Sequence, residues 1–526
     1  MTERKYPIGI QTFSEIIRGG YLYIDKTDLV WQLAHEAKYI FLSRPRRFGK
    51  SLLSTTLESY FVGDKDLFHG LKISALEEDW EQYPVIHLDL SVVKGQQDAD
   101  SLASRLMLLL KGYGKRYGTD RDEITPGGML QGLINRIVAK TGKQAVVLVD
   151  EYDAPLLDVL HEDRKLEDMR RVMQEFYSPL KACERNIRFC FITGITKFSQ
   201  LSIFSTINNL LNVSMDPHFS TICGITEREL TETLGPDITA LSDFMGISPD
   251  QMHVRLKTKY DGYHFSEQSE EVYNPYSLLK AFLQRKLGNY WFESGTPTFL
   301  IRQLQRFRTD ITALDNLVVP VYAFDQPTEN MQTALPLLYQ SGYLTIKDYD
   351  PDVEAYTLAL PNMEVREGYI QGLLPVYAGL DAAEVQMGFA AKFWKALKAE
   401  DIDLAMRELQ AYLAGIPYVE GFKKKLADAA TAEGFYEYTF YLIFSMLNVY
   451  VRTQVKCAGG RIDMVVWMPQ TTYVFEFKTD GTAQEALRQI DGKGYALPYN
   501  TAGRPVVKVG VKMNPATRSV ENWIIA

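Results

Sequence analysis

Short apolar runs alternate with longer amphipathic segments along the first 225 residues of the chain. Four runs have the length and composition of buried strands, at 39–43, 85–90, 145–149 and 187–192. The segments between them, at 50–62, 101–116, 127–140 and 164–184, space their apolar side chains as amphipathic helices do. This alternation predicts an α/β fold in which a parallel sheet is wrapped by helices.

The pattern changes at about residue 226 and stays mostly helical up to about residue 430. Aromatic-rich turns at 260–265 and 273–276 interrupt it, and two strand-like runs at 343–347 and 355–360 predict a small hairpin or winged-helix-like element. No repeat of fixed period is evident, so a solenoid is not supported. We interpret this region as a helical lid and connector.

A third pattern follows residue 430. We expect a helix over 435–450, strands over 452–456, 461–467 and 473–477, a helix over 482–494, and strands near 506–511 and 522–525. Together these elements predict a compact C-terminal α/β unit. The expected domains are therefore residues 1–225, 226–414 and 415–526.

Length and composition agree with several globular domains. With 526 residues, 46% of them hydrophobic and 23% charged, the chain is too long for one core and too apolar to be mainly disordered. Its first residues lack the apolar segment of a signal peptide, and no run approaches the roughly 20 apolar residues of a membrane span. The four cysteines show neither zinc-site nor disulfide spacing. We therefore expect a cytoplasmic protein with buried thiols and no membrane segment.

The charge is unevenly distributed along the chain. The formal net charge is -9, but residues 452–513 carry nine lysines and arginines against five acids, a balance of +4. The rest of the chain then sums to -13. This asymmetry makes the C-terminal segment the better candidate for contact with a polyanion, DNA or RNA.

The first predicted strand runs into Arg44-Pro-Arg-Arg-Phe-Gly49-Lys50-Ser51 and then into a helix. This is the context of a Walker A loop, in which backbone N–H groups, an ammonium and a hydroxyl receive phosphates and Mg²⁺. Gly49, Lys50 and Ser51 can supply these groups. Arg44 stands where the motif has its first glycine. Arg44, Arg46 and Arg47 are candidate phosphate contacts, with solvated loop charges as the alternative.

The predicted strand at 145–149 ends in Asp150 and Glu151. In an ATPase, Asp150 would hold Mg²⁺ through water and Glu151 would orient the water that attacks the γ-phosphate. The alternative is an acidic cap after a buried strand. The predicted strand at 187–192 leads to Thr193 and Lys197, which are candidate sensors of the γ-phosphate.

These motifs resemble a bacterial AAA-ATPase-like family, whose members carry an Arg-Pro-Arg-Arg-Phe-Gly-Lys-Ser/Thr loop and a Val-Asp-Glu-Tyr-Asp strand end. The resemblance covers about residues 4–225. It implies a P-loop NTPase-like domain that uses ATP and Mg²⁺. It also implies that the arginine at position 44 is a trait of the family and not a damaged loop.

A second set of polar residues lies in the C-terminal segment. Asp463 falls in one predicted strand, and Glu476 and Lys478, two residues apart, share one face of the next. Two carboxylates from neighbouring strands can bind Mg²⁺ for phosphodiester cleavage, while a lysine orients the nucleophile. The order of these residues predicts a metal-dependent nuclease site.

This order resembles the PD-(D/E)XK nuclease superfamily over about residues 415–515. The resemblance implies a further metal-site acid at Glu437, in the preceding helix. It also implies that Gln489 and Tyr495 belong to the Gln-x(5-6)-Tyr version of the motif. Some members of such a superfamily keep the fold for binding alone.

Two functional hypotheses follow. The first is an ATP-controlled, Mg²⁺-dependent nuclease acting on DNA or RNA. The second is a nucleotide-dependent switch or scaffold whose C-terminal fold binds a partner without cutting it. Intact Glu476 and Lys478 favour the first, and the lack of a strong basic stripe favours the second. The sequence leaves open whether the chain forms a homo-oligomer.

Overall fold

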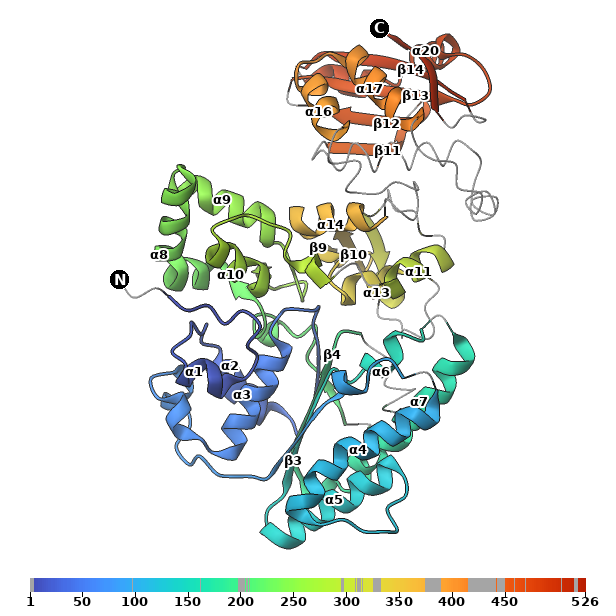
Figure 1. Ribbon diagram of the computed structural model, residues 1–526. Helices are drawn as coiled ribbons and strands as arrows, with labels where there is room; N and C mark the ends of the chain where they lie inside the picture. The colour runs from blue at the N-terminus through green and yellow to red at the C-terminus, as the bar shows by residue number, and fades with distance from the viewer. Residues whose placement is uncertain are drawn as a thin grey trace. The chain divides into compact units, whose positions relative to one another are not determined.

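The computed structural model describes most of the chain. The described residues are 4–96, 98–160, 162–196, 204, 207, 209–294, 298–307, 309, 314, 316–324, 333–373, 389–414, 441, 450–457, 459–468, 470–502, 504–514 and 519–526. The chain divides into two compact units, one of residues 1–309 and 316–365 and one of residues 310–315 and 366–526 (Figure 1). The division falls inside the predicted connector, and the three domain limits given above stay a prediction.

The first unit contains a five-stranded parallel sheet with the strand order β2-β3-β4-β1-β5. Its strands are β1 (Tyr39–Ser43), β2 (Val85–Asp89), β3 (Ala145–Asp150), β4 (Ile187–Gly194) and β5 (Leu211–Asn212). Strands β3 and β4 consist largely of buried Val, Ile, Leu and Phe, as expected for central strands covered on both faces. The predicted α/β fold with a parallel sheet is thus confirmed. Only the short β5 was not predicted.

Helices cover both faces of this sheet, with α1, α2 and α3 on one side and α4, α5 and α7 on the other (Figure 1). Their bounds are α1 Phe13–Arg18, α2 Thr27–Glu36, α3 Lys50–Val62, α4 Ala99–Tyr117, α5 Pro126–Thr141, α6 Ala154–Leu157 and α7 Asp163–Ala182. Because all the strands are parallel, the segments that follow β1, β3 and β4 emerge at one edge of the sheet. That edge carries the residues singled out by the sequence.

The rest of the first unit is mostly helical, as predicted. Its helices are α8 (Glu227–Met245), α9 (Pro249–Tyr260), α10 (Pro275–Gln284), α11 (Thr298–Arg306), α12 (Val321–Phe324), α13 (Leu335–Gln340) and the start of α14 (Met363–Leu373). The short strands β6 (Ile225–Thr226) and β7 (Val272–Tyr273) pair with each other. The predicted hairpin is present as β9 (Thr345–Asp350) and β10 (Ala355–Ala359), and β8 (Leu317–Pro320) adds a third strand.

The N-terminal segment joins this helical part to the sheet. Leu230, Leu234, Leu256 and other buried side chains of α8, α9 and α10 form one apolar cluster, and Tyr6, Ile8, Leu22 and Ile24 pack against it. Residues that precede the first strand of the sheet therefore contact a part of the chain about 200 positions later. This packing brings the helical part close to the loop after β1.

The second unit contains a five-stranded mixed sheet with the order β11-β12-β13-β14-β15. Its elements are α16 (Ala390–Lys398), α17 (Ile402–Ala414), β11 (Tyr450–Cys457), β12 (Gly460–Trp467), β13 (Thr472–Lys478), α20 (Ala483–Gly492), β14 (Val506–Asn514) and β15 (Ser519–Ile525). Strands β13 and β14 are parallel, and α20 crosses between them and packs on both. The predicted strands and the helix near 482–494 are confirmed. The helix expected over 435–450 lies outside the described residues, apart from Tyr441 and Tyr450, and Tyr450 begins β11.

Among the described residues, no helix combines the length and the hydropathy that crossing a lipid bilayer requires.

Candidate functional site

The loop of residues 44–49 between β1 and α3, called here the phosphate loop, is closed by Lys50, the first residue of α3. Lys50 is buried, and its ammonium donates to the carbonyl oxygens of Arg44 and Pro45, each at 3.0 Å. Gly49 has φ +94°, a left-handed conformation that glycine adopts at little cost. The chain thus turns sharply into α3, whose first N–H groups have no partners within the helix. This geometry is suited to an anion.

The carboxylates of Asp150, the last residue of β3, and of the next residue, Glu151, interact electrostatically with Lys50. Burial lowers the pKa of Lys50, and the charges of Asp150 and Glu151 oppose that shift. Burial likewise raises the pKa of Glu151, which the charge of Lys50 opposes. The Asp150 carboxylate accepts from the N–H of Glu151 at 2.9 Å, and Glu151 has φ +49°. A positive φ at a residue other than glycine is sparsely populated and often marks a functional site.

The sequence did not single out Asp153, which links the ends of β3 and β4. Its buried carboxylate accepts from the N–H of Ile195 at 3.1 Å and from the N–H and the hydroxyl of Thr196 at 2.6 and 2.5 Å. A Cβ at Gly194 would lie 2.5 Å from the Asp153 carboxylate, so this crossing requires a glycine. The signal available in the sequence was the third acid of Asp150-Glu151-Tyr152-Asp153.

The candidate sensor Thr193 is engaged within the sheet. Its side chain is fully buried, and its hydroxyl donates to the carbonyl oxygen of Leu42 on β1 at 2.7 Å. Thr193 therefore ties β4 to β1, and this hydrogen bond does not support it as a phosphate ligand. Lys197, the other candidate sensor, lies outside the described residues.

The three arginines of the phosphate loop have different surroundings. The guanidinium of Arg44 is buried, donates to the carbonyl oxygens of Ser214 at 2.7 Å and Phe219 at 3.0 Å, and lies 4.2 Å from the ring centroid of Phe265. Arg44 is thus committed to the protein interior, contrary to its expected role at a phosphate. The reason is that the segment after β5 places the carbonyl oxygens of Ser214 and Phe219 where the side chain points.

Arg47 and Arg46 remain at least partly accessible. Arg47 donates to the carbonyl oxygen of Tyr290 at 2.6 Å and lies over the Tyr276 ring at 4.0 Å. For the side chain of Arg46, the described residues show no hydrogen-bond or ion-pair partner, and it is half-buried. Of the three arginines, Arg46 alone has a guanidinium that is not engaged in the described contacts.

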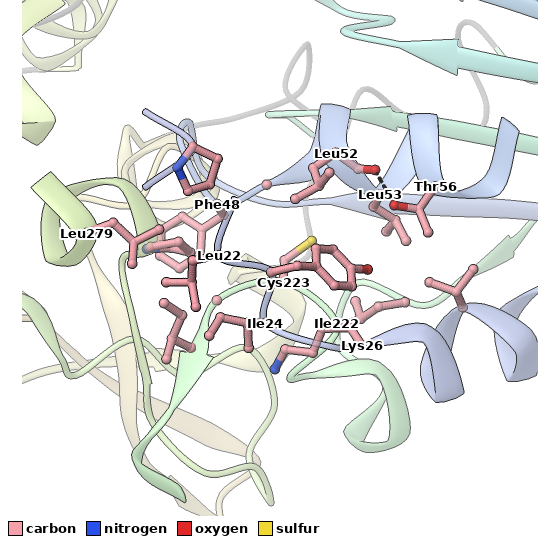
Figure 2. Close-up of a pocket in the computed structure, with 17 residues that line it drawn as sticks. Leu22, Ile24, Lys26, Phe48, Leu52, Leu53, Thr56, Ile222, Cys223 and Leu279 are labelled. Carbon is pink, nitrogen blue, oxygen red and sulfur yellow. Dashed lines mark hydrogen bonds between the residues drawn. The ribbon is translucent and has the colours of Figure 1, made fainter. Parts of the chain in front are cut away.

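An apolar pocket lies beside the phosphate loop (Figure 2). The empty space within it, counted together with open solvent at its mouth, is about 630 Å³. Its wall combines Leu22 and Ile24 of the N-terminal segment, Phe48 of the loop, and Leu279 of α10. Among the described residues that line it, none carries a carboxylate, and the one cation, Lys26, is paired with Glu229 at 2.7 Å. No sequence pattern indicates this pocket, because its wall is assembled from distant segments.

The second candidate site lies where β12 and β13 meet. Opposite pairing of Met464 and Phe475 brings Asp463 beside Glu476, and the Asp463 carboxylate accepts from the N–H of Phe477 at 2.8 Å. Burial and the charge of Asp463 raise the pKa of Glu476 to about 8. Oε2 of Glu476 is buried and has no hydrogen-bond partner among the described residues. An unpartnered carboxylate oxygen next to a second carboxylate suits a divalent cation.

Lys478 and Gln489 complete this arrangement. The ammonium of Lys478 donates to the side-chain oxygen of Gln489 at 2.7 Å and lies 3.6 Å from Oε1 of Glu476. The side-chain nitrogen of Gln489 donates to the same Oε1. Gln489, from α20, therefore fixes both residues of β13. Described residues nowhere form a group of three or more His, Cys, Asp or Glu side chains suited to a metal, and Glu437 lies outside them.

Tyr495 is part of the core beneath this site. Its ring is buried with Ile462, Leu487 and Ile490. A Cβ at Gly460 would lie 3.0 Å from the Tyr495 hydroxyl, and Gly460 has φ +138°. Tyr495 thus supports the turn that begins β12.

Comparison with known proteins agrees with both parts of the chain. Residues 7–204 match a family model described as a predicted AAA-ATPase, and residues 431–523 match one described as the PD-(D/E)XK nuclease superfamily. A protein of Azotobacter chroococcum mcd 1, described as an uncharacterized protein in the vnfD 5' region, is 34% identical over 536 aligned residues. That alignment covers 100% of this chain and 99% of the relative.

The chain belongs to the AAA-ATPase-like family and carries a C-terminal PD-(D/E)XK nuclease superfamily domain. Both predicted resemblances are confirmed. In this AAA-ATPase-like protein the matched ranges contain the phosphate loop, the carboxylates after β3, and the site of Asp463 and Glu476. Residues 222–225 and Leu279, on the far wall of the pocket, lie outside both ranges.

Proposed function

We propose that the N-terminal part of this protein binds ATP with Mg²⁺ and hydrolyses it. The observation that carries this proposal is the position of Lys50, which closes the phosphate loop and shares its electrostatic surroundings with Asp150 and Glu151. A buried ammonium needs compensating negative charge. Two protein carbonyls supply part of that charge, and the phosphates of a nucleotide would supply more.

Each residue of this site has a specific task in the proposal. The N–H groups of Gly49, Lys50 and Ser51 bind phosphate oxygens, and Arg46 reaches them from the loop. The Ser51 hydroxyl and Asp150 hold Mg²⁺, which neutralises charge on the β- and γ-phosphates. Glu151 orients the attacking water, a task suited to a carboxylate whose pKa burial raises.

The apolar pocket beside the loop is the proposed site of the base. Phe48 and Leu279 would contact the two faces of a planar ring, and backbone groups of 222–225 would meet its polar edge. A guanine would ordinarily call for a carboxylate acceptor for its N1–H and 2-amino group, and no described lining residue has one. The lining therefore favours adenine.

We propose that the C-terminal domain is a Mg²⁺-dependent nuclease acting on DNA or RNA. Asp463 and Glu476 hold the ion, and the unpartnered Oε2 of Glu476 is the observation that supports it. Lys478, oriented by Gln489, positions the attacking water. Mg²⁺, when bound, would lower the pKa of that water and stabilise charge on the phosphodiester.

A second candidate function is supported by a specific observation. In the part of the chain that the structure describes, two carboxylates but not three converge at this site. The side chains of Lys478 and Glu476 also both form hydrogen bonds with Gln489. A domain that binds a partner without cutting it, controlled by nucleotide in the first unit, would have this arrangement.

The two candidates are separated by assaying the full chain on plasmid, linear DNA and RNA in Mg²⁺ or Mn²⁺, with and without ATP. Glu476→Gln should abolish cleavage, whereas the exposed acid of the same sheet, in Glu521→Gln, should not matter. Lys50→Ala should abolish ATP turnover, and Lys65→Ala, at an exposed site, should leave it intact. Cleavage that survives Glu476→Gln would overturn the nuclease site. No cleavage by the wild type, with nucleic acid still bound, would favour the binding function.

A further inference from the structure

The dipeptide Tyr290–Trp291 forms hydrogen bonds with the middle of the phosphate loop. Arg47 donates to the carbonyl oxygen of Tyr290 at 2.6 Å, and the indole N–H of Trp291 donates to the carbonyl oxygen of Arg46 at 3.2 Å. The two contacts point in opposite directions, one donated by the loop and one accepted by it. Together they tie the middle of the loop to a segment about 240 positions later in the sequence.

The dipeptide is itself held by one buried carboxylate. Oε1 of Glu364 accepts from the N–H of Tyr290 at 2.6 Å and from the N–H of Trp291 at 3.0 Å. Glu364 is fully buried at the start of α14, and burial raises its pKa to about 7. Burying an acid is costly unless its hydrogen bonds compensate. Two successive N–H groups directed at one oxygen provide that compensation and define the path of the dipeptide.

Trp291 of the dipeptide is closely packed against the turn after α13. A Cβ at Gly342 would lie 2.7 Å from Cβ of Pro45 and 3.3 Å from Cζ2 of Trp291, so the turn after α13 fits between loop and indole only as glycine. The Trp291 ring also lies 5.0 Å from the ring of Tyr343. Side chains packed this closely occupy a few discrete arrangements and do not shift gradually from one position to another.

We propose that Glu364 is a positioning residue for nucleotide binding, acting through Tyr290–Trp291 to hold the phosphate loop in the shape that receives the phosphates. The inference rests on the proposed ATP site. Glu364 does not touch the nucleotide. It holds Tyr290–Trp291 in place as a fixed partner for the Arg47 side chain and the Arg46 carbonyl oxygen, so the loop loses less freedom when phosphates bind. By linkage, a nucleotide that orders the loop must tighten the contact between Glu364 and the dipeptide by the same factor.

The test measures binding of a fluorescent ATP analogue and steady-state ATP turnover with the full chain. Glu364→Ala should raise the dissociation constant and KM by roughly tenfold while kcat changes less than about twofold, and Glu364→Gln, which keeps an acceptor oxygen, should restore part of the affinity. Trp291→Phe should weaken binding in the same direction, since it removes the indole N–H and keeps an aromatic ring. The matched control is Asp261→Asn, another buried carboxylate of the helical part, which should leave the dissociation constant unchanged.

A second measurement reports directly on the hydrogen bonds between Glu364 and the dipeptide. Hydrogen exchange at the amides of Tyr290 and Trp291 should slow when ATP and Mg²⁺ are added to the wild type, and this protection should be lost in Glu364→Ala. If wild type binds ATP but both Trp291→Phe and Glu364→Gln bind as tightly as wild type, the inference is overturned and the proposed function stands. If wild type does not bind ATP at all, the proposed function itself fails. Should Glu364→Ala not fold, Trp291→Phe and Glu364→Gln still decide.

Discussion

The ammonium of Lys50 donates at 3.0 Å to the carbonyl oxygen of Arg44, so the lysine of the motif is bound to its first residue. At that first position the usual glycine is replaced by an arginine whose side chain leaves the loop and enters the protein interior. The loop can therefore close around its lysine although its first residue carries a long side chain. The substitution anchors the loop through the Arg44 side chain. Backbone groups, and not this side chain, then face the space inside the loop.

Arg44 should consequently matter for stability and Arg46 for binding. Arg44→Ala removes the guanidinium donor from the buried carbonyl oxygen of Ser214, and it removes one of two donors from that of Phe219, which keeps the N–H of Ile222. We expect a loss of roughly 3 kcal/mol in the free energy of unfolding, measured by urea denaturation. Arg46→Ala should change stability by less than about 0.5 kcal/mol and weaken ATP binding several-fold. The opposite pattern, with Arg44→Ala stable and defective only in binding, would restore Arg44 as a phosphate contact.

The apolar pocket predicts a separation between base and phosphate recognition. Leu279→Trp should fill the space next to Phe48 and lower the affinity for ATP by about tenfold or more. Binding of inorganic triphosphate, which needs the phosphate loop alone, should be unchanged. Competition titrations with both ligands measure this. Equal effects on ATP and triphosphate would show that the pocket does not hold the base.

Gln489 should be important to the C-terminal site although the proposed metal ligands are Asp463 and Glu476. Gln489→Ala frees Lys478 and Glu476 from the contacts that orient them, and we expect cleavage to slow about ten- to a hundredfold with the fold intact. Single-turnover cleavage of a labelled duplex in Mn²⁺ provides the measurement, and Gln484→Ala, an exposed amide of the same helix, is the control. An unchanged rate in Gln489→Ala would exclude this positioning role.

The buried acid Glu364 predicts a pH dependence of stability. Burial raises its pKa to about 7 from an ordinary value of 4.5, with the charge of Lys259 acting in the opposite direction. Between these values the folded chain keeps a proton that the unfolded chain releases, so this residue's contribution to stability falls as pH rises from about 4.5 to about 7. The difference in unfolding free energy between wild type and Glu364→Gln should decrease by on the order of 3 kcal/mol over that window. A difference independent of pH would contradict the shift.

Elements with a strong periodic signal could be predicted from the sequence. Strands β1, β3 and β4 consist mostly of apolar residues, and they lie where the apolar runs of the sequence predict them. Strands that are buried on both faces give such runs in place of an alternation of apolar and polar residues. Strand β5, of two residues, has no period at all. In the C-terminal domain, the spacing of Asp463, Glu476 and Lys478 was sufficient to identify neighbouring strands.

Side-chain direction was the part that the sequence could not supply. Arg44 was expected at a phosphate, but whether an arginine enters the loop or the interior depends on the carbonyl oxygens of Ser214 and Phe219, some 170 residues later. Thr193 is similar, since its hydroxyl is used by the neighbouring strand. The apolar pocket and the hydrogen bond from the N–H of Tyr290 to Glu364 also form only when segments that are distant in the sequence meet.

We propose above that the phosphate loop of this chain binds ATP with Lys50 as the main cationic contact. The most direct test is a calorimetric titration of ATP in Mg²⁺ into wild type and Lys50→Ala, with folding checked by thermal denaturation. We predict saturable binding to wild type with one site per chain and a loss of affinity of at least about tenfold in Lys50→Ala. Equal affinity in both proteins, or no binding to a folded wild type, would contradict the account.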